Sequence, residues 1–294
     1  MSGSNVGVVI TCYELGRTLP EAVESVWAQT EPAREIIVVD DGSEDVLTRQ
    51  VLVWLEEDSR PVRVIRSEHR GAAYARNLGL AETTAPLAVL LDGDDAFEPR
   101  YLELAADVLR DREDLSFVCC ALQAFGRASY RWKPPPYTVA EALGRGACGH
   151  ISTVFRREVW ERNGGFDESL PAYEDVDFWL RALQQGYRGV ILDEALVRYR
   201  VRKASRYHSA IVRGEYLRAK QLLVDRHLAG ARGEDVLATL LDFQRELVGH
   251  ARSLEDERVA LEDSLAGVEA EVSVAREQLL ARGVAPFEWG RFER

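Results

Sequence analysis

The stretch LAVLLDGDDAF, residues 87–97, decides the fold, because an apolar run ends there in three carboxylates. Its first five residues have the length and composition of a strand buried on both faces, as is usual in parallel sheets. Asp92, Asp94 and Asp95 then follow within four positions. Such a cluster indicates either a cation site or an acidic turn that caps the next helix. Its position directly after a buried strand favours the cation site.

The residues around this stretch alternate between strands and helices. Apolar and β-branched runs predict strands within 6–11, 34–43, 62–67 and 87–95, and apolar residues at helical spacing predict helices within 18–29, 46–57, 71–84 and 98–110. This rhythm predicts βαβ units and an α/β fold with a doubly wound, mostly parallel sheet. Because right-handed crossovers bring the carboxyl ends of the strands to one edge, we expect ligands there.

Polar residues follow two further strands of this predicted sheet. Thr11 and Tyr13 come after the first strand, and Asp40 and Asp41 come after the second. No glycine-rich phosphate-binding loop accompanies them, so backbone amides alone would not hold a phosphate. Clustered carboxylates repel one another and repel phosphate, and a divalent cation removes both repulsions. The sequence therefore predicts Mg²⁺ or Mn²⁺ between these carboxylates and a diphosphate.

The composition limits the classes of function. The 294 residues are 46% apolar, enough for a sizeable core, and their net charge of −12 argues against nucleic-acid binding. No apolar run approaches the roughly 20 residues of a membrane span. The N-terminal MSGSNVGVVITCYE lacks a signal-peptide pattern, and the four cysteines form no CxxC pair or metal spacing. We therefore expect a cytoplasmic protein with free thiols.

Several motifs, in order along the chain, resemble one known family. They are VVITCYELGRTLPEAVESVWAQT (8–30), EIIVVDDGSED (35–45), GAAYARNLGL (71–80), LLDGDDAFEP (90–99) and TVFRREVWERNGGFDESLPAYEDVDFWLRALQQGY (153–187). Together they resemble the family-2 glycosyltransferases of the GT-A fold over about two thirds of the chain, residues 6–202. The resemblance implies a catalytic domain at 1–205, with a nucleotide-binding half at 1–97 and an acceptor half at 98–205.

The resemblance also implies a reaction. It is metal-dependent transfer of a sugar from a UDP-sugar to an acceptor hydroxyl in the synthesis of a cell-surface glycan or polysaccharide. The acceptor would be a saccharide, a lipid-linked molecule or a small molecule. Neither the resemblance nor the residues specify the sugar.

The resemblance assigns the nucleotide contacts one by one. Thr11 and Tyr13 match positions that line the nucleobase, Tyr13 by stacking. Asp41 matches the aspartate that reads the uracil edge, and Asp40 beside it is the weaker candidate. Arg76, in the segment ARN, is expected to approach the phosphates.

The resemblance likewise assigns the reacting carboxylates. Asp92 is placed toward the ribose and sugar, Asp94 and Asp95 nearest the metal, and Asp175 as the catalytic base. The metal stabilises the charge of the leaving diphosphate, and the base removes the proton of the acceptor hydroxyl. A single base with in-line attack inverts the anomeric centre, so we predict an inverting enzyme.

Residues near Asp175 allow structural and functional interpretations. Glu174, Asp175 and Asp177 begin a predicted helix, where the macrodipole favours acidic side chains whatever their function. Glu174 is a weaker candidate for a contact with acceptor or phosphate. Trp179 lies at core spacing in the same helix and is more simply a core residue than a sugar platform. His150 precedes a predicted strand at 152–159 and is either a hydrogen-bonded structural histidine or an acceptor contact.

One position departs from the family pattern. Relatives often carry a histidine that contacts metal or phosphate after a Tyr-Arg-hydrophobic segment. Here the segment reads RYRVRKASRYH (198–208), with Arg202 where that histidine would fall and His208 six residues later. Either Arg202 neutralises the diphosphate or His208 takes over, and the sequence leaves both open.

The C-terminal third, residues 206–294, is predicted to be a helical extension. The segment 198–232 contains ten Lys and Arg but only two acidic residues. This excess of positive charge suits either a solvated helix near the diphosphate or contact with the anionic inner face of a membrane. Over 234–282 apolar residues mostly step by three and four, as in a coiled coil. They are Val236, Leu240, Phe243, Leu247, Leu254, Leu261, Leu265, Val268, Val272, Ala275 and Leu279. We therefore expect a homo-oligomer through these helices.

Two other functions remain open at this point. A sugar nucleotidyltransferase would also bind a nucleotide and metal on an α/β sheet. It would need a Gly-rich loop with Lys or Arg after the first strand, whereas the loop TCYELGRTL (11–19) has a single cation, Arg17. A non-catalytic scaffold assembled through the coiled coil is the second alternative. Loss of Asp94 or Asp175 would have favoured the scaffold, and both residues are present.

Overall fold

The computed structural model of the chain describes residues 5–139, 142, 149–202 and 215–227. His208 and the predicted coiled coil at 234–282 lie outside these ranges. The chain divides into two compact units, 1–239 and 240–294, and every described residue belongs to the first. Among the described residues, no helix combines the length and the apolar character needed to cross a membrane.

The elements alternate as the sequence predicts in the first part of the chain. This part contains β1 (Val6–Cys12), α1 (Leu19–Trp27), β2 (Glu35–Asp40), α2 (Val46–Glu57), β3 (Arg63–Arg66), α3 (Ala72–Glu82) and β4 (Leu87–Asp92). The remainder contains β5 (Ala96–Phe97), α4 (Tyr101–Asp111), β6 (Phe117–Gly126), β7 (Tyr130–Trp132), β8 (Val154–Arg156), α6 (Arg157–Asn163), α7 (Glu174–Gln184), β9 (Gly189–Val201) and α9 (Glu215–His227). The predicted strands and helices of the first part, and α4 after them, are confirmed.

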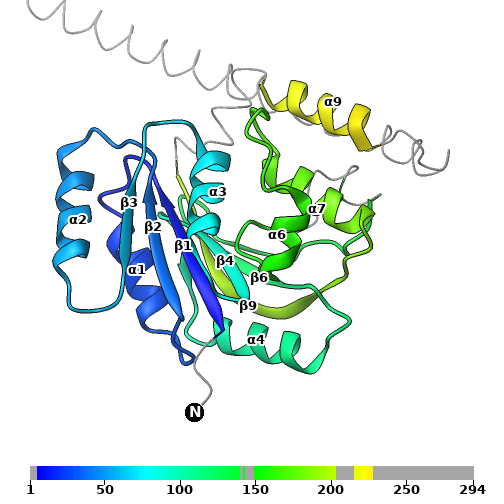
Figure 1. Cartoon of the computed structure of the whole chain (residues 1–294), viewed down its shortest axis with the longest axis horizontal. Coiled ribbons are helices and arrows are strands. Elements are labelled where there is room, and N and C mark those ends of the chain that lie inside the picture. The colour runs from blue at the N-terminus through cyan, green and yellow to red at the C-terminus, as the bar shows by residue number, and fades with distance from the viewer. Residues whose placement is uncertain (1–4, 140–141, 143–148, 203–214, 228–294) are drawn as a thin grey trace, which may run out of the picture. The chain divides into compact units, whose positions relative to one another are not determined.

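One sheet lies between two layers of helices (Figure 1). Its strand order is β3-β2-β1-β4-β8-β6-β9-β5, and β7 pairs with β6. Helices α1, α2 and α4 pack with Val8 and Ile10 of β1 on one face. Helices α3, α6 and α7 pack with Val9 on the other face, because successive side chains of a strand point to opposite sides. This confirms the α/β fold with a mostly parallel sheet.

The four strands predicted from the sequence run in the same direction. β2 and β4 flank β1 in parallel, with Asp40 opposite Cys12 and Asp92 opposite Thr11, and β3 pairs in parallel with β2. Their carboxyl ends therefore share one edge of the sheet, where ligands of such sheets bind. The predicted meeting of polar residues at this edge is confirmed.

The other half of the sheet rests on two long strands that the sequence analysis does not identify. β6 and β9 pair in parallel, starting with Phe117 opposite Gly189. β5 pairs antiparallel with the end of β9, where Ala96 lies opposite Arg198. The residues directly after the acidic cluster are thus joined to an arginine-rich strand end.

The predicted strand at 152–159 is wrong in its second part. β8 ends at Arg156, and α6 begins with the next residue. Val159 and Asn163, four residues apart, are the buried positions of α6, and Gly164 at φ +72° ends the helix. The helical spacing of the buried residues and the glycine at the helix end are therefore better indicators of the structure here than the short β-branched run, which predicts a strand.

Candidate functional site

The carboxyl ends of β1 and β4 carry the first predicted site residues. Thr11 Oγ1 donates a 3.2 Å hydrogen bond to Asp92 Oδ1. Tyr13 lies beyond β1, is 43% exposed, and stacks on the ring of His69 with 4.1 Å between centroids. An exposed aromatic ring backed by a second ring is a suitable platform for a nucleobase.

Asp41 organises the loop between β3 and α3. Its two carboxylate oxygens accept 2.9 Å hydrogen bonds from the backbone N–H groups of Arg70 and Gly71, and His69 Nδ1 lies 2.9 Å from Oδ2. Gly42 follows at φ +78°, where a Cβ would come 2.6 Å from the backbone nitrogen of His69, so this turn needs glycine. The loop thereby connects Asp41, the candidate for reading the edge of the nucleobase, to His69, which is one ring of the aromatic platform.

Asp40 is buried to almost the same extent as Asp41 and contacts its own turn. It is 3% exposed, and its Oδ1 accepts a 3.2 Å hydrogen bond from the backbone N–H of Ser43. Burial and the Asp40 charge raise the pKa of the Cys12 thiol to about 12, so this cysteine stays neutral. Burial does not separate Asp40 from Asp41, so the lower rank of Asp40 stays a prediction.

Asp94 and Asp95 meet the arginines at the end of β9. Arg202 Nε lies 2.6 Å from Asp94 Oδ2. The backbone N–H of Arg200 donates a 2.8 Å hydrogen bond to Asp95 Oδ1, and its Nε donates to the Asp94 carbonyl at 2.8 Å. Burial and the Asp92 charge raise the pKa of Asp94 and raise that of Asp95 well above its usual range. A cation at this point would therefore favour the ionised carboxylates.

Arg76 is a buried bridge between the two halves of the site. It is 3% exposed, and its guanidinium pairs with Asp92 at 3.0 Å and with Glu174. Burial opposes the charge, but the carboxylates of Asp92, Glu174 and Asp175 raise the pKa of Arg76. The sequence analysis expects Arg76 to approach the phosphates, whereas the structure directs it to carboxylates inside the protein. One guanidinium thus joins the end of β4 to the start of α7.

Three acidic residues begin α7, and they differ in burial. Glu174 is 2% exposed and Asp177 is 0% exposed, so both are ion-pair partners in the interior. Asp175 is half-buried, and its Oδ1 accepts a 2.9 Å hydrogen bond from the N–H of Val176. Tyr173 precedes the helix at φ +62°, an uncommon conformation for a residue other than glycine. Of these three acids, Asp175 is the one that is not fully buried.

The weaker acceptor candidates are mainly structural. Trp179 is 1% exposed and packs 4.9 Å from the ring of Phe117, so it offers no surface to a sugar. His150 Nε2 lies 3.0 Å from the carbonyl oxygen of Cys120, in agreement with the hydrogen-bonded alternative. His208 lies outside the described residues, so the structure places Arg202 but not His208 relative to the carboxylates.

The donor set at the end of β4 suits a hard divalent cation. The side chains of Asp92 and Asp94 are 34% and 13% exposed, whereas Asp95 is 4% exposed overall. Within the described ranges, no three His, Cys, Asp or Glu side chains form a ready-made ion site. Mg²⁺ and Mn²⁺ need no such cage, because they combine one or two carboxylates with water and phosphate oxygens. The residues present therefore fit the predicted metal.

A cavity of about 550 Å³ opens on the acceptor half. It is lined by residues 164–169 together with Asn77, Arg181 and Arg226. The same loop is tied to α3, because Asn77 donates to the Phe166 carbonyl at 2.9 Å and accepts from its N–H at 2.8 Å. The acceptor half therefore has a polar, charged cavity beside the helix that carries Asp175.

Three residues with contacts at the site escape the sequence analysis. His69 sits in SEHRG (67–71), and polar residues after a predicted strand could have drawn attention to it. Arg200 alternates with Arg198 in β9 and with Arg202 directly after it, a pattern that becomes informative only once the strand is known. Arg226 reaches the acceptor half from a helix far along the chain, and no local signal marks it.

Comparisons with known proteins agree with this geometry. The family described as Glycosyl transferase family 2 matches residues 7–161. The chain is 29% identical over 211 residues to EpsE of Bacillus subtilis, covering 69% of this chain and 75% of EpsE. It is 29% identical over 240 residues to the succinoglycan biosynthesis protein ExoU of Rhizobium meliloti, covering 76% of this chain and 66% of ExoU.

Solved structures share the fold. S. aureus TarS 1–349 in complex with UDP-GlcNAc has a TM-score of 0.67 at 19% identity, over 81% of this chain and 72% of that one. The mannosyltransferase PcManGT from Pyrobaculum calidifontis, in complex with GDP-Man and Mn²⁺, has a TM-score of 0.53 at 20% identity, over 88% and 81%. At these identities the likeness shows the fold alone. The family match spans more than half of the chain, and the chain therefore belongs to glycosyl transferase family 2 and is a glycosyltransferase.

Proposed function

We propose that this glycosyltransferase is inverting and metal-dependent, and that it moves a sugar from a UDP-sugar to an acceptor hydroxyl in glycan or polysaccharide synthesis. The observation that carries the proposal is the buried bridge of Arg76, which joins Asp92 at the donor edge to Glu174, directly before Asp175. A candidate base and a candidate diphosphate site thus lie against one guanidinium. The name of ExoU supports polysaccharide synthesis, and the UDP-GlcNAc complex of TarS supports a uridine donor.

In the proposed reaction Asp175 accepts the proton of the acceptor hydroxyl. It is partly exposed at the first turn of α7, the helix whose Arg181 lines the cavity. A general base contributes roughly 10²–10⁴-fold when it is positioned within hydrogen-bond reach of the hydroxyl. Glu174 does not compete for this role, because its carboxylate is buried against Arg76. In-line attack by the hydroxyl that this single base deprotonates would invert the anomeric centre.

The leaving diphosphate would be held at the end of β4. Asp94, with Asp92 or Asp95, would hold the metal, which when bound supplies Lewis-acid stabilisation of the developing negative charge. The complex of PcManGT with Mn²⁺ supports a metal for this fold. The side chain of Arg202 is 39% exposed and contacts Asp94. When the metal neutralises the Asp94 carboxylate, Arg202 would be available to bind the diphosphate.

Calorimetric titration with UDP, GDP and TDP, with and without Mn²⁺, tests the proposed donor site. We expect tight binding of UDP only when the metal is present. Asp94→Asn should abolish this metal-dependent binding. Asp175→Asn should keep UDP binding and lose sugar transfer by about 10²-fold or more, because it removes the base.

An exposed acid serves as the control for these substitutions. Asp111→Asn at the end of α4 changes the charge equally and should leave binding and transfer as in the wild type. Full transfer activity of Asp175→Asn would show that the base is assigned wrongly. Absence of nucleotide binding by the wild type with metal would contradict the donor site itself.

A further inference from the structure

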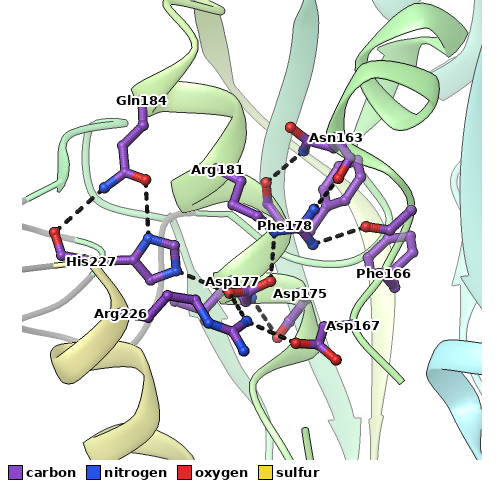
Figure 2. A network of polar contacts seen from close by, with 12 residues as sticks. Asn163, Phe166, Asp167, Asp175, Asp177, Phe178, Arg181, Gln184, Arg226 and His227 are labelled. Carbon is purple, nitrogen blue, oxygen red and sulfur yellow. Dashed lines mark hydrogen bonds and ion pairs between the residues drawn. The ribbon is translucent and has the colours of Figure 1, made fainter. Parts of the chain in front are cut away.

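A fully buried carboxylate stands two residues after the candidate base. Asp177 is 0% exposed and is contacted by two arginines and a histidine: Arg181 Nε at 2.7 Å, Arg226 Nη1 at 2.9 Å and His227 Nε2 at 2.9 Å. Figure 2 shows Arg226 and His227 reaching this carboxylate from α9, while Arg181 comes from the same helix as Asp177. The start of α7 is therefore held by a helix that lies after the strands of the sheet.

The same groups also bind other parts of the acceptor half. Arg226 Nη1 lies 2.8 Å from Asp167 Oδ2, in the loop that lines the cavity. His227 Nδ1 lies 3.1 Å from Gln184 Oε1, at the last residue of α7. Two adjacent residues of α9 thus contact the loop before α7, its first turn and its end, as Figure 2 shows.

The contact of α9 is buried as well as charged. Ala219 and Leu223 are 0% and 2% exposed, and Leu223 belongs to the core cluster that includes Phe178 of α7. His227 is 4% exposed. Burial raises the pKa of Asp177, but the hydrogen bond from His227, the charge and hydrogen bond of Arg181 and the hydrogen bond from Arg226 lower it to about 2. Asp177 is therefore ionised at neutral pH, and removal of one cation leaves it undercompensated in the interior.

The first turn of a helix is the part most dependent on such an anchor. Its backbone N–H groups lack partners within the helix, and opening of helices begins at their ends. Asp175 sits in this turn, and displacement of a reacting group by about 1 Å can cost about 10²-fold in rate. A contact that holds the turn can therefore control the reaction without touching the substrate.

We propose that α9 is a clamp that positions the catalytic base, with Arg226 and His227 as positioning residues that hold the first turn of α7 through Asp177. The proposal rests on the role of Asp175 given above. It makes the geometry of the acceptor half depend on residues beyond β9. The expected consequence of weakening the clamp is a lower rate of transfer with an unchanged donor site.

Hydrogen–deuterium exchange on the full-length chain tests the clamp without a known substrate. We compare Arg226→Gln with Arg218→Gln, the same substitution at an exposed position of α9. Arg226→Gln should speed amide exchange over residues 173–180 by about tenfold and leave residues 35–45 unchanged, because opening is confined to the clamped turn. Arg218→Gln should match the wild type at both places. Arg226→Lys should restore part of the protection, because an ammonium group can still pair with Asp177.

A kinetic measurement separates positioning from general damage. With a UDP-sugar that the wild type cleaves, Arg226→Gln should lower kcat for UDP release about tenfold or more while KM for the donor and UDP affinity stay within about twofold. Unchanged exchange over 173–180, or increased exchange with wild-type kcat, would overturn the proposal. Equal losses in kcat and UDP affinity would also overturn it, because they indicate global destabilisation. Failure of the proposed function would show separately, as no UDP binding by the wild type.

Discussion

The site depends on single buried charges whose partners come from distant parts of the chain. Arg76 pairs with Asp92, 16 residues away, and with Glu174, 98 residues away. Both its own side chain and that of Glu174 are 3% exposed. In such surroundings a charge that loses its partner pays a desolvation cost without an attraction to offset it. Breaking this bridge should therefore lower the free energy of unfolding by more than breaking a surface ion pair does.

We expect Arg76→Gln to lower the free energy of unfolding by about 3–5 kcal/mol, because it leaves the Glu174 carboxylate buried without its cation. Arg63→Gln is the matched control, since it removes an ion pair with Glu82 whose side chains are 51% and 45% exposed. Its cost should stay below about 1 kcal/mol. Urea unfolding measures both variants. Equal costs would show that the Arg76 bridge is no more important to stability than a surface pair.

The sequence predicts single residues well where the signal is local. Asp92 and Asp94 follow a buried run directly, so their place at the carboxyl edge follows from the strand pattern alone. The burial of Arg76 does not, because the carboxylate that completes its environment lies 98 residues away and no periodicity links them. The sequence likewise does not show that Glu174 is buried and Asp175 partly exposed, because this difference arises from contacts with distant residues.

Among the elements, α3 comes so close to the sheet that its packing needs a glycine. A Cβ at Gly79 would lie 2.2 Å from Val9 Cγ1 and 3.0 Å from Val39 Cγ2. This close approach sets the position of the same helix's Arg76 and Asn77, which contact α7 and the cavity loop. The packing of α3 therefore contributes to the geometry of the site.

Gly79→Ala should lower the free energy of unfolding by about 1–3 kcal/mol through overpacking against β1. Helix propensity alone would predict the opposite sign, since alanine is favoured over glycine by about 1 kcal/mol in a helix interior. Ala81→Gly, at an exposed position of α3, isolates the propensity effect and should cost about that 1 kcal/mol. Thermal unfolding followed by circular dichroism measures both, and a stabilised Gly79→Ala would contradict the close approach.

Elements with regular local patterns are predictable, and those fixed by distant pairing are not. β1, β2 and β4 are nearly continuous apolar runs, β3 is a short β-branched one, and helices lie between them, so all four strands are predicted. β6 and β9 pair with each other across more than 60 intervening residues, and β9 mixes apolar and charged residues, so neither is identified. The end of β8 is predicted wrongly because a helix begins at Arg157. This helix is recognisable only from its two buried residues, which lie four positions apart.

At the scale of the whole molecule, α9 lies in the segment that the sequence analysis assigns to a C-terminal extension. The predicted boundary lies at residue 205, yet α9 packs within the unit 1–239. Among the described residues of the basic segment 198–232, four arginines pair with carboxylates of this unit, which leaves fewer cations for a membrane surface. These arginines are Arg198, Arg200, Arg202 and Arg226. Contact with a membrane stays a prediction.

Assembly through the apolar stripe at 234–282 also stays a prediction, because the stripe lies outside the described residues. Light scattering of the full-length chain should give a mass of at least twice 33.0 kDa. Leu254→Glu combined with Leu261→Glu should reduce it to 33.0 kDa, because a coiled-coil seam does not accept unpaired charges. Glu255→Gln with Glu262→Gln, between the same stripe positions, should leave the mass unchanged. A wild type of 33.0 kDa would refute assembly, and an oligomer that survives the leucine substitutions would require another interface.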